Sequence, residues 1–276
     1  MAIQKELQFF PVDNANKKRL SIEQIESFNK NGFIFPITVF NSVQIGKISN
    51  YFNSLLDSAK KVGYEDYSIN GWHYHCRGIY DIMMNSIILD YVSDLLGPNV
   101  LNIMTHLFYK RSQDERRVSW HQDASYWPLT PTKTVTVWLA LDDVSEQNGA
   151  MKFIPGSHRH GQIPFQKSDL QEHNVLNQTV TDPQGWGESA VSVELKAGQI
   201  SIHSDLLLHG SEPNLSTTDR RGLTLRYMPS DVQCIDSNFG KNRRAFQCLG
   251  KNTEKYWSVL PPPIGEAIPL KLESPL

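Results

Sequence analysis

Residues 117–141 read RVSWHQDASYWPLTPTKTVTVWLAL and contain two runs typical of β-strands, 117–121 and 132–141. Both runs are rich in β-branched and aromatic side chains, and Pro128 interrupts the segment between them. Comparable short runs, separated by Gly, Pro and Asn turns, occur at 101–110, 150–154, 190–195, 199–203 and 223–228. Short strands without intervening helices predict an antiparallel sandwich or barrel over the second part of the chain.

The first 97 residues differ, because their apolar side chains recur at helical spacing. Residues 21–32 show this pattern from Ser21 as N-cap to Gly32 as the stop, and helices are also predicted for 42–62 and 80–96. Residues 33–40 are predicted as an edge strand because they contain Pro36. We therefore expect one domain over 1–276, with a helical layer over about 20–97, a barrel over about 100–230 and a C-terminal cover over 231–276.

Composition indicates a folded globular protein, since 39% of the 276 residues are hydrophobic and only 20% are charged. The 27 Lys and Arg balance 29 Asp and Glu to a net charge of −2, and no long basic run is present. This argues against a general nucleic-acid or membrane-surface binder. Three cysteines without a CxxC motif, no secretory leader and no long apolar run predict a cytoplasmic protein. The oligomeric state stays open.

The motif His121-Gln122-Asp123 could supply two metal ligands. Residues i and i+2 of a strand point to the same side, so an imidazole nitrogen and a carboxylate oxygen can converge on one ion. A lone HxD motif is weak evidence, because it arises often by chance. His209, at the end of the apolar run 206–208, could be a third ligand. Two histidines and one carboxylate form the facial triad of Fe(II) oxygenases, which leaves three positions open on a six-coordinate iron.

Arg220 and Arg221 follow His209 and precede the strand predicted at 223–228. A guanidinium can hold a carboxylate through two parallel hydrogen bonds, so an arginine at the barrel floor suits the far end of a dicarboxylate. His203 is interpreted as structural rather than as half of a His203/Asp205 catalytic pair, because no nucleophile elbow accompanies it.

The sequence resembles the phytanoyl-CoA dioxygenase family of Fe(II)/2-oxoglutarate-dependent oxygenases over roughly residues 20–230. The resemblance is carried by ordered motifs: Asn31-Gly32-Phe33-Ile34, Gly97-Pro98-Asn99, Trp120-His121-Gln122-Asp123, Val137-Trp138-Leu139-Ala140-Leu141-Asp142, Asn148-Gly149-Ala150-Met151, Ile154-Pro155-Gly156-Ser157-His158 and His209-Gly210-Ser211-Glu212-Pro213-Asn214. It implies a mostly β protein with an α-helical N-terminal layer, built on a double-stranded β-helix, the jelly-roll or cupin-like barrel.

The resemblance also implies roles for individual residues. His121, Asp123 and His209 would bind Fe(II), and Arg220 would bind the distal carboxylate of 2-oxoglutarate. Three more residues match positions that line the cosubstrate: Ser211, Trp138 and His106, the last where some relatives have a methionine. Trp127 matches a position that often faces the prime substrate. From its place on a Gly71-flanked aromatic loop, the segment with Trp72 and Tyr74 is interpreted as a substrate lid rather than a second metal site.

The expected function is therefore hydroxylation of an unactivated C–H bond in a small molecule, with dioxygen as co-substrate and release of succinate and CO2. A polar or specialised metabolite is favoured over an acyl-CoA, because no basic CoA-binding run is present. A halogenase is disfavoured because Asp123 occupies the position that halogenases leave free for chloride. A barrel that binds metal or ligand without catalysis remains the alternative from another class.

Overall fold

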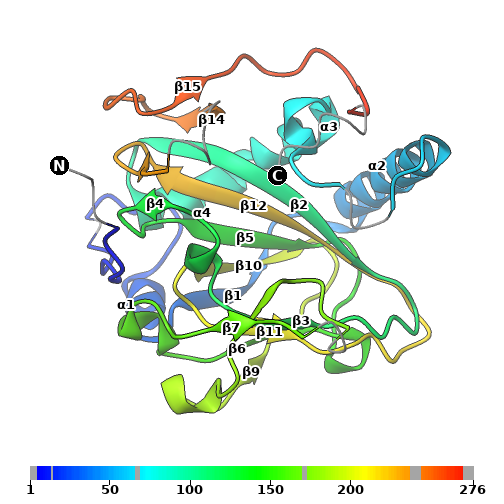
Figure 1. The fold of residues 1–276 in the computed structure, drawn as a ribbon. Coiled ribbons are helices and arrows are strands. Elements are labelled where there is room, and N and C mark those ends of the chain that lie inside the picture. The colour runs from blue at the N-terminus through cyan, green and yellow to red at the C-terminus, as the bar shows by residue number, and fades with distance from the viewer. Residues whose placement is uncertain (1–4, 14, 66–68, 170–172, 237–243, 270–276) are drawn as a thin grey trace.

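The computed structural model describes residues 5–13, 15–65, 69–169, 173–236 and 244–269. Its β-strands form two main sheets that lie one above the other, with helices on the outer side of the larger one (Figure 1). The architecture is mostly β with a helical N-terminal layer, as predicted.

The major sheet has the strand order β1-β10-β5-β12-β2-β14-β15. The bounds of these strands are β1 (Phe33–Thr38), β2 (Val100–Lys110), β5 (Val135–Ala140), β10 (Gln199–Ser204), β12 (Arg220–Pro229), β14 (Arg244–Leu249) and β15 (Ser258–Val259). All neighbours pair antiparallel except β14 and β15. β1 is an edge strand, as the proline at position 36 predicted.

The minor sheet has the order β3-β11-β6-β9, with β3 (Val118–His121), β6 (Met151–Phe153), β9 (Val191–Ser192) and β11 (His209–Ser211). Two short pairs complete the described strands: β4 (Leu129–Thr130) with β13 (Gln233–Cys234), and β7 (Gln166–Lys167) with β8 (Gln178–Thr179). Short 3-10 turns connect several of these strands: η2 (Trp72–Tyr74), η3 (Asp123–Ser125), η4 (Glu146–Asn148), η5 (Ser157–His160) and η7 (Gln184–Trp186).

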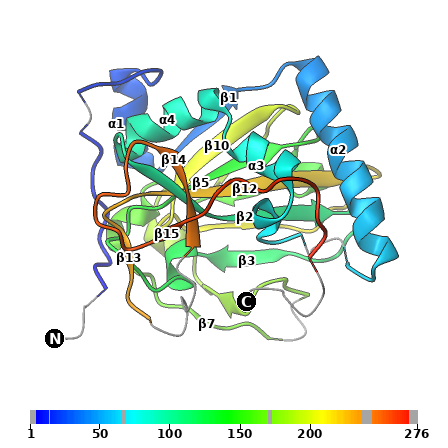
Figure 2. The same cartoon turned by 90° about the horizontal axis from the view of Figure 1, so that it is seen from above.

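Helices α1 (Ile22–Asn31), α2 (Ser42–Lys61), α3 (Arg77–Met83) and α4 (Ser86–Leu96) precede the second strand. α1 has the predicted caps, because Ser21 and Gln24 form a capping box and Gly32 closes the helix with a φ of 88°. Figure 2 shows α2, α3 and α4 over the strands of the major sheet. Their buried side chains share one core with the outer face of that sheet, including Leu107, Val137 and Leu223.

Two segments differ from expectation. The helix predicted over 80–96 is split, because the Asn85 side chain accepts hydrogen bonds from the amides of Ile87 and Ile88 and so starts a new helix. The C-terminal region does more than cover the barrel, because β14 pairs with β2 inside the major sheet. Among the described residues, no helix is both long enough and apolar enough to cross a membrane.

Candidate metal centre and cosubstrate pocket

Three predicted metal ligands meet between the two sheets. His121 ends β3, Asp123 opens η3 and His209 begins β11. His121 and His209 are direct partners in the β3–β11 ladder, and their ring centroids are 4.1 Å apart. One ligand atom from each of the three residues lies within 4.8 Å of the others. All three side chains are buried.

Backbone contacts fix the tautomer of both histidines. Nδ1 of His121 lies 2.8 Å from the carbonyl oxygen of Ser119, and Nδ1 of His209 lies 2.9 Å from that of Leu207. A carbonyl oxygen only accepts, so Nδ1 carries the proton and the lone pair is on Nε2. Burial, together with the neighbouring imidazoles of His121 and His203, holds the pKa of His209 well below its usual value. His209 is therefore neutral, the state that a metal ligand requires.

One oxygen of Asp123, Oδ2, contacts side chains of the major sheet. Oδ2 accepts a 2.7 Å hydrogen bond from the Thr136 hydroxyl and lies 3.7 Å from Nε of Arg226 and 3.8 Å from Nε2 of His203. Oδ1 instead faces Nε2 of His121 at 3.8 Å. Burial alone would raise the pKa of this carboxyl, but Arg226 and the contacts with His121 and His203 hold the pKa well below its usual value. Asp123 therefore presents one charged oxygen, Oδ1, beside the two histidines.

These donors fit Fe(II). Two imidazole nitrogens and one carboxylate oxygen from one side of a cavity are the donor set of the facial triad, which leaves coordination positions open. The side chains behind them, above all Thr136, have the orienting role that hydrogen-bonded groups around metal ligands usually have.

Arg220 lines the same cavity as the three ligands, whereas Arg221 does not. The pairing of β12 with β5 and β2 explains the difference, because successive side chains of a strand alternate between faces. Nη2 of Arg220 donates to the carbonyl of Gly149 at 2.6 Å. Arg221 lies on the helix side, where it pairs with Asp142 at 2.6 Å and donates to the Ser49 hydroxyl of α2.

Trp138 and Ser211, two residues predicted to line the cosubstrate, also border this cavity. The guanidinium of Arg220 lies over the Trp138 ring, 5.6 Å from its centroid. Ser211 lies two residues after His209 on β11. Arg220, Ser211 and Trp138 thus line the same cavity as the three ligands.

The other predicted site residues lie elsewhere. His106 stacks on Phe108 and lines a neighbouring cavity of about 500 Å³, together with Arg116, His173, Asn174, Val175 and Leu176. Phe108 borders both that cavity and the metal cavity. Trp127 is 6% exposed and is packed with Leu101, Leu129 and Met228 rather than among the described residues that line the metal cavity. Its ring contacts the guanidinium of Arg226, 5.2 Å from the centroid.

The segment predicted as a lid is placed mainly in the interior. Trp72 is 2% exposed and packs edge-on against Tyr64 in the core beneath the helices. The Tyr74 hydroxyl lies 3.1 Å from the backbone carbonyls of Ile103 and Arg244. The physical reason is that large aromatic side chains on this loop bury apolar area against the outer face of the sheet. Neither residue is among the described residues that line the metal cavity.

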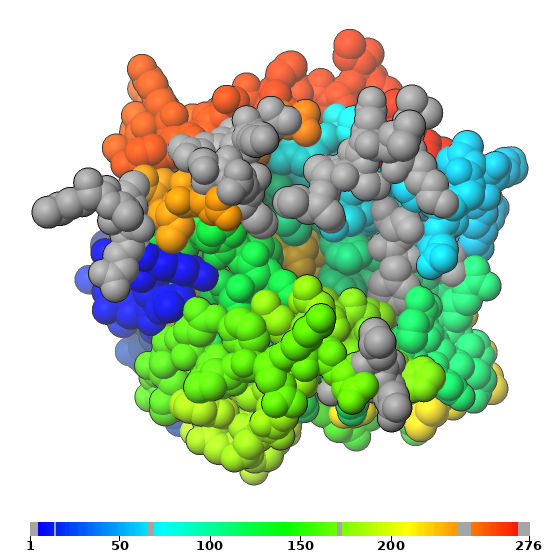
Figure 3. All heavy atoms as spheres, viewed as in Figure 1, coloured from blue at the N-terminus to red at the C-terminus, as the bar shows by residue number. Residues whose placement is uncertain are grey.

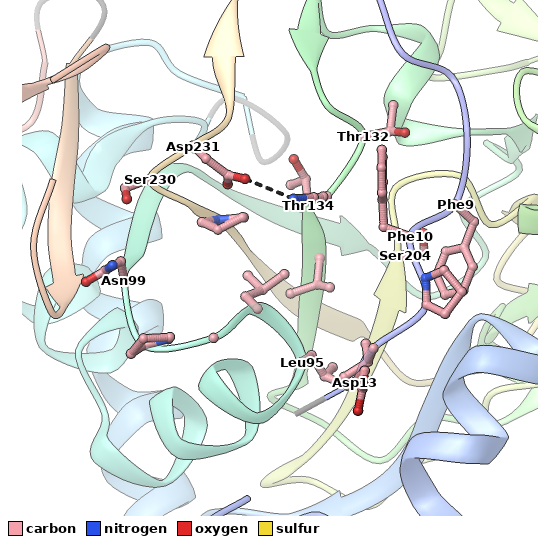
Figure 4. A pocket seen from close by; sticks show the side chains of 18 of the residues that line it. Phe9, Phe10, Asp13, Leu95, Asn99, Thr132, Thr134, Ser204, Ser230 and Asp231 are labelled. Carbon is pink, nitrogen blue, oxygen red and sulfur yellow. Dashed lines mark hydrogen bonds and ion pairs between the residues drawn. The ribbon is translucent and has the colours of Figure 1, made fainter. Parts of the chain in front are cut away.

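Figure 3 has a hollow near the centre of the face it shows, with part of the gold strand β12 visible at its bottom. A separate cavity of about 630 Å³ lies apart from the metal ligands, between the N-terminal segment and the ends of α4 and β12. It is larger than the cavity lined by His106. Phe9, Leu95, Asn99, Thr134 and Asp231 border this larger cavity (Figure 4). Of the residues that the structure describes, none lines both this cavity and the metal cavity.

Sequence reasoning missed the residues that surround Asp123. Thr136, His203 and Arg226 are neighbours across β5, β10 and β12, because His203 and Arg226 both pair with Thr136. Strand alternation from Arg220 through Thr224 would have placed Arg226 on the inner face. The sequence does not indicate that these three strands are neighbours in the sheet.

Comparison with known proteins identifies the relationship. The sequence model described as phytanoyl-CoA dioxygenase matches residues 29–222, which is most of the chain. The chain belongs to the phytanoyl-CoA dioxygenase family. It is thereby one of the Fe(II)/2-oxoglutarate-dependent oxygenases, as the sequence motifs predicted, and Fe(II), 2-oxoglutarate and dioxygen are the cofactor and cosubstrates of this enzyme class.

Individual relatives of this phytanoyl-CoA dioxygenase family member differ in their named substrates. A probable alpha-ketoglutarate-dependent hypophosphite dioxygenase of Stutzerimonas stutzeri is 29% identical over 58% of this chain and 56% of its own length. The peroxisomal phytanoyl-CoA dioxygenase of Bos taurus is 23% identical over 79% of this chain and 71% of its own length. The chain thus spans little more than half of the first of these relatives.

Solved structures support the fold. The non-heme monooxygenase ThoJ is 26% identical, with a TM-score of 0.73 over 87% of this chain and 88% of that chain. CytC3 with Fe(II) and alpha-ketoglutarate has a TM-score of 0.66 at 22% identity, over 87% of this chain and 93% of that chain. Both likenesses cover most of this chain and support the fold class that the sequence predicted.

Proposed function

We propose that this protein hydroxylates an unactivated C–H bond of a small polar metabolite, with conversion of 2-oxoglutarate to succinate and CO2. The observation that carries the proposal is that His121, Asp123 and His209 converge at a cavity that Arg220 also lines. A metal at the triad and a dicarboxylate held by Arg220 would share this cavity.

In this proposal each side chain has a defined task. His121 and His209 offer Nε2, and Asp123 offers Oδ1 while Thr136 holds Oδ2. Arg220 binds the distal carboxylate of 2-oxoglutarate through charge-assisted hydrogen bonds, with Ser211 as a second donor and Trp138 as a wall. An iron held by these three side chains would supply the oxidising chemistry with dioxygen and 2-oxoglutarate. The buried walls exclude water and so protect the oxidant from side reactions.

The substrate class follows from the cavity beyond Phe108. Its described lining combines the apolar Val175 and Leu176 with His106, Arg116 and His173, which suits a molecule with polar or anionic groups on a short carbon frame. Burial of Trp127 and Trp72 leaves Phe108 as the aromatic side chain between the two cavities. An acyl-CoA substrate is the second candidate, because the family's namesake acts on one.

Succinate release tests the function. The full chain is reconstituted without oxygen in Fe(II) and 2-oxoglutarate, then exposed to ¹⁸O-labelled dioxygen with and without a metabolite extract. We expect succinate from the wild-type protein and none from Asp123→Ala, and the extract should yield a product that carries one ¹⁸O. A protein that binds Fe(II) yet forms no succinate would instead be a non-catalytic barrel, and a chlorinated product formed with added chloride would indicate a halogenase.

A further inference from the structure

Lys110 is a fully buried lysine that neither the metal triad nor the proposed cosubstrate contacts use. It ends β2 and pairs directly across the ladder with Arg220 of β12. Its relative exposure is 0%, and no described carboxylate forms an ion pair with it. Isolated buried charges are costly, so such a lysine needs a counter-charge or loses its proton.

The ammonium group of Lys110 is held by Ser211 and the residue after it. Nζ lies 2.8 Å from the Ser211 hydroxyl oxygen and 3.3 Å from the Ser211 carbonyl, and it also contacts the carbonyl of Glu212. A charged lysine has three N–H donors and no acceptor. When charged, Lys110 donates to all three oxygens, and the Ser211 hydroxyl must point its own proton away, toward the cavity.

A neutral Lys110 reverses this hydrogen bond. A neutral amine keeps a lone pair, so the Ser211 hydroxyl can donate to Nζ and is then lost as a donor to the cavity. The charge state is poised to change, because burial and the charge of Arg220 lower the pKa of Lys110 to about 6. The other charged groups that face it are Asp114 and Glu212, which favour the proton, and Arg116, which opposes it.

We propose that Lys110 is a positioning residue for the cosubstrate. Lys110 takes up a proton as the distal carboxylate of 2-oxoglutarate binds, and the charged Lys110 then turns the Ser211 hydroxyl toward that carboxylate. The arriving negative charge offsets Arg220 and attracts the proton. The proton comes from solvent, and no covalent bond changes. The inference rests on the proposed function, because it assumes that Arg220 and Ser211 receive the distal carboxylate.

Calorimetry tests the proton uptake without turnover. 2-Oxoglutarate is titrated into the full chain loaded with Ni(II), without iron, in two buffers that differ in heat of ionisation and do not bind Ni(II). At pH 7.5 the wild-type protein should take up close to one proton per 2-oxoglutarate. Its association constant should fall by up to about tenfold per pH unit between pH 7 and 8.5.

Lys110→Met should remove both the proton uptake on 2-oxoglutarate binding and the pH dependence of the association constant. Its association constant should be flat over pH 7–8.5. The gap from wild type should be about ten- to thirtyfold at pH 7 and should shrink toward the alkaline end, as Lys110 of the wild-type complex loses its proton. Lys196→Met is the matched control, because Lys196 is exposed and pairs with Asp143 at the surface. The control should keep the wild-type proton uptake and pH dependence.

Ser211→Ala tests whether Lys110 acts through the hydroxyl. If it does, the losses in 2-oxoglutarate affinity from Lys110→Met and Ser211→Ala should not add in the double variant. Fully additive losses would overturn the positioning role.

The outcomes distinguish a failure of the Lys110 inference from a failure of the proposed function. If the wild-type protein binds 2-oxoglutarate without proton uptake, the inference is wrong while the proposed function stands. If it binds Ni(II) but no 2-oxoglutarate, the proposed function itself fails. Should Lys110→Met not fold, the wild-type buffer comparison decides alone, because zero uptake contradicts the inference and uptake near one proton supports it.

Discussion

Gly222 lies directly beneath the indole ring of Trp138. A Cβ atom built at position 222 would lie 1.8 Å from Cζ2 of Trp138, so only glycine leaves room for the ring. The two residues lie on neighbouring strands, β12 and β5, and the same ring contacts Arg220. The absence of a side chain at position 222 therefore sets how Trp138 packs against the proposed carboxylate site.

Gly222→Ala should displace Trp138 and with it Arg220. We expect an overpacking loss of about 1–3 kcal/mol in the free energy of unfolding, measured by urea denaturation, and weaker 2-oxoglutarate binding. Gly46→Ala is the control, because a Cβ there meets no atom within 4 Å inside α2. It should stabilise the protein by about 0.5–1 kcal/mol. Equal stability of the two variants would show that Trp138 can move freely.

Asp123→Ala and His209→Ala should each abolish turnover and weaken Ni(II) binding. His209→Ala should change the thermal unfolding temperature little, whereas Asp123→Ala should lower it, because buried Arg226 loses its counter-charge. Ligands at a cavity wall provide coordination rather than core packing. His160→Ala, in the loop after β6, is the control and should keep full metal affinity. Wild-type Fe(II)-dependent turnover in either ligand variant would refute the triad.

Thr136→Val should weaken metal binding without removing it. The substitution deletes the hydroxyl that donates to Oδ2 of Asp123 at 2.7 Å and keeps the shape of the side chain. Loss of such an orienting hydrogen bond typically lowers metal affinity by about 10–100-fold. Thr130→Val, on β4, is the matched control. Competition with a metal chelator measures both variants, and equal affinities would mean that Thr136 does not orient the ligand.

Arg220→Ala should raise the KM for 2-oxoglutarate by at least about tenfold, since the lost charge-assisted hydrogen bonds are worth roughly 1.5–3 kcal/mol. Arg221→Ala should leave that KM near wild type, because its guanidinium is bound to Asp142 on the helix side. Steady-state kinetics at saturating Fe(II) compare the two. The reverse result would place the cosubstrate on the other face of β12.

Asp205 should make the protein less stable as the pH rises. Its side chain is buried, and burial raises the pKa of the carboxyl to about 7 from an ordinary value of 3.8. Between those values the folded protein holds a proton that the unfolded chain has lost, so stability decreases with pH, by at most about 1.4 kcal/mol per unit, and levels off above about pH 7. Asp205→Asn should lack this dependence. Urea unfolding at pH 5, 6, 7 and 8 measures both proteins, and parallel curves would contradict the assignment.

The sequence was most informative where local rules decide. Ser21 and Gly32 bounded the first helix, and the alternation of β-type runs indicated the sheets. The His121-Gln122-Asp123 motif and His209 were recognisable because their residue types and order are specific. What the sequence could not show is which strands are neighbours. Arg226, Thr136 and His203 converge on Asp123 only through pairings of distant strands. Trp127 and Trp72 were candidates for substrate contact, because aromatic residues suit pockets as well as cores.

The pairing of His121 with His209 ties metal binding to the order of folding. The two residues are 88 positions apart, and they face each other only after the chain between them has returned to β3. Contacts of such long sequence separation form slowly, because a large loop must close first. A shift of β11 by one residue would turn His209 to the opposite face of the sheet. Metal binding therefore shows that the minor sheet has formed in its native register. The rate of metal binding after dilution from denaturant measures how fast the minor sheet forms.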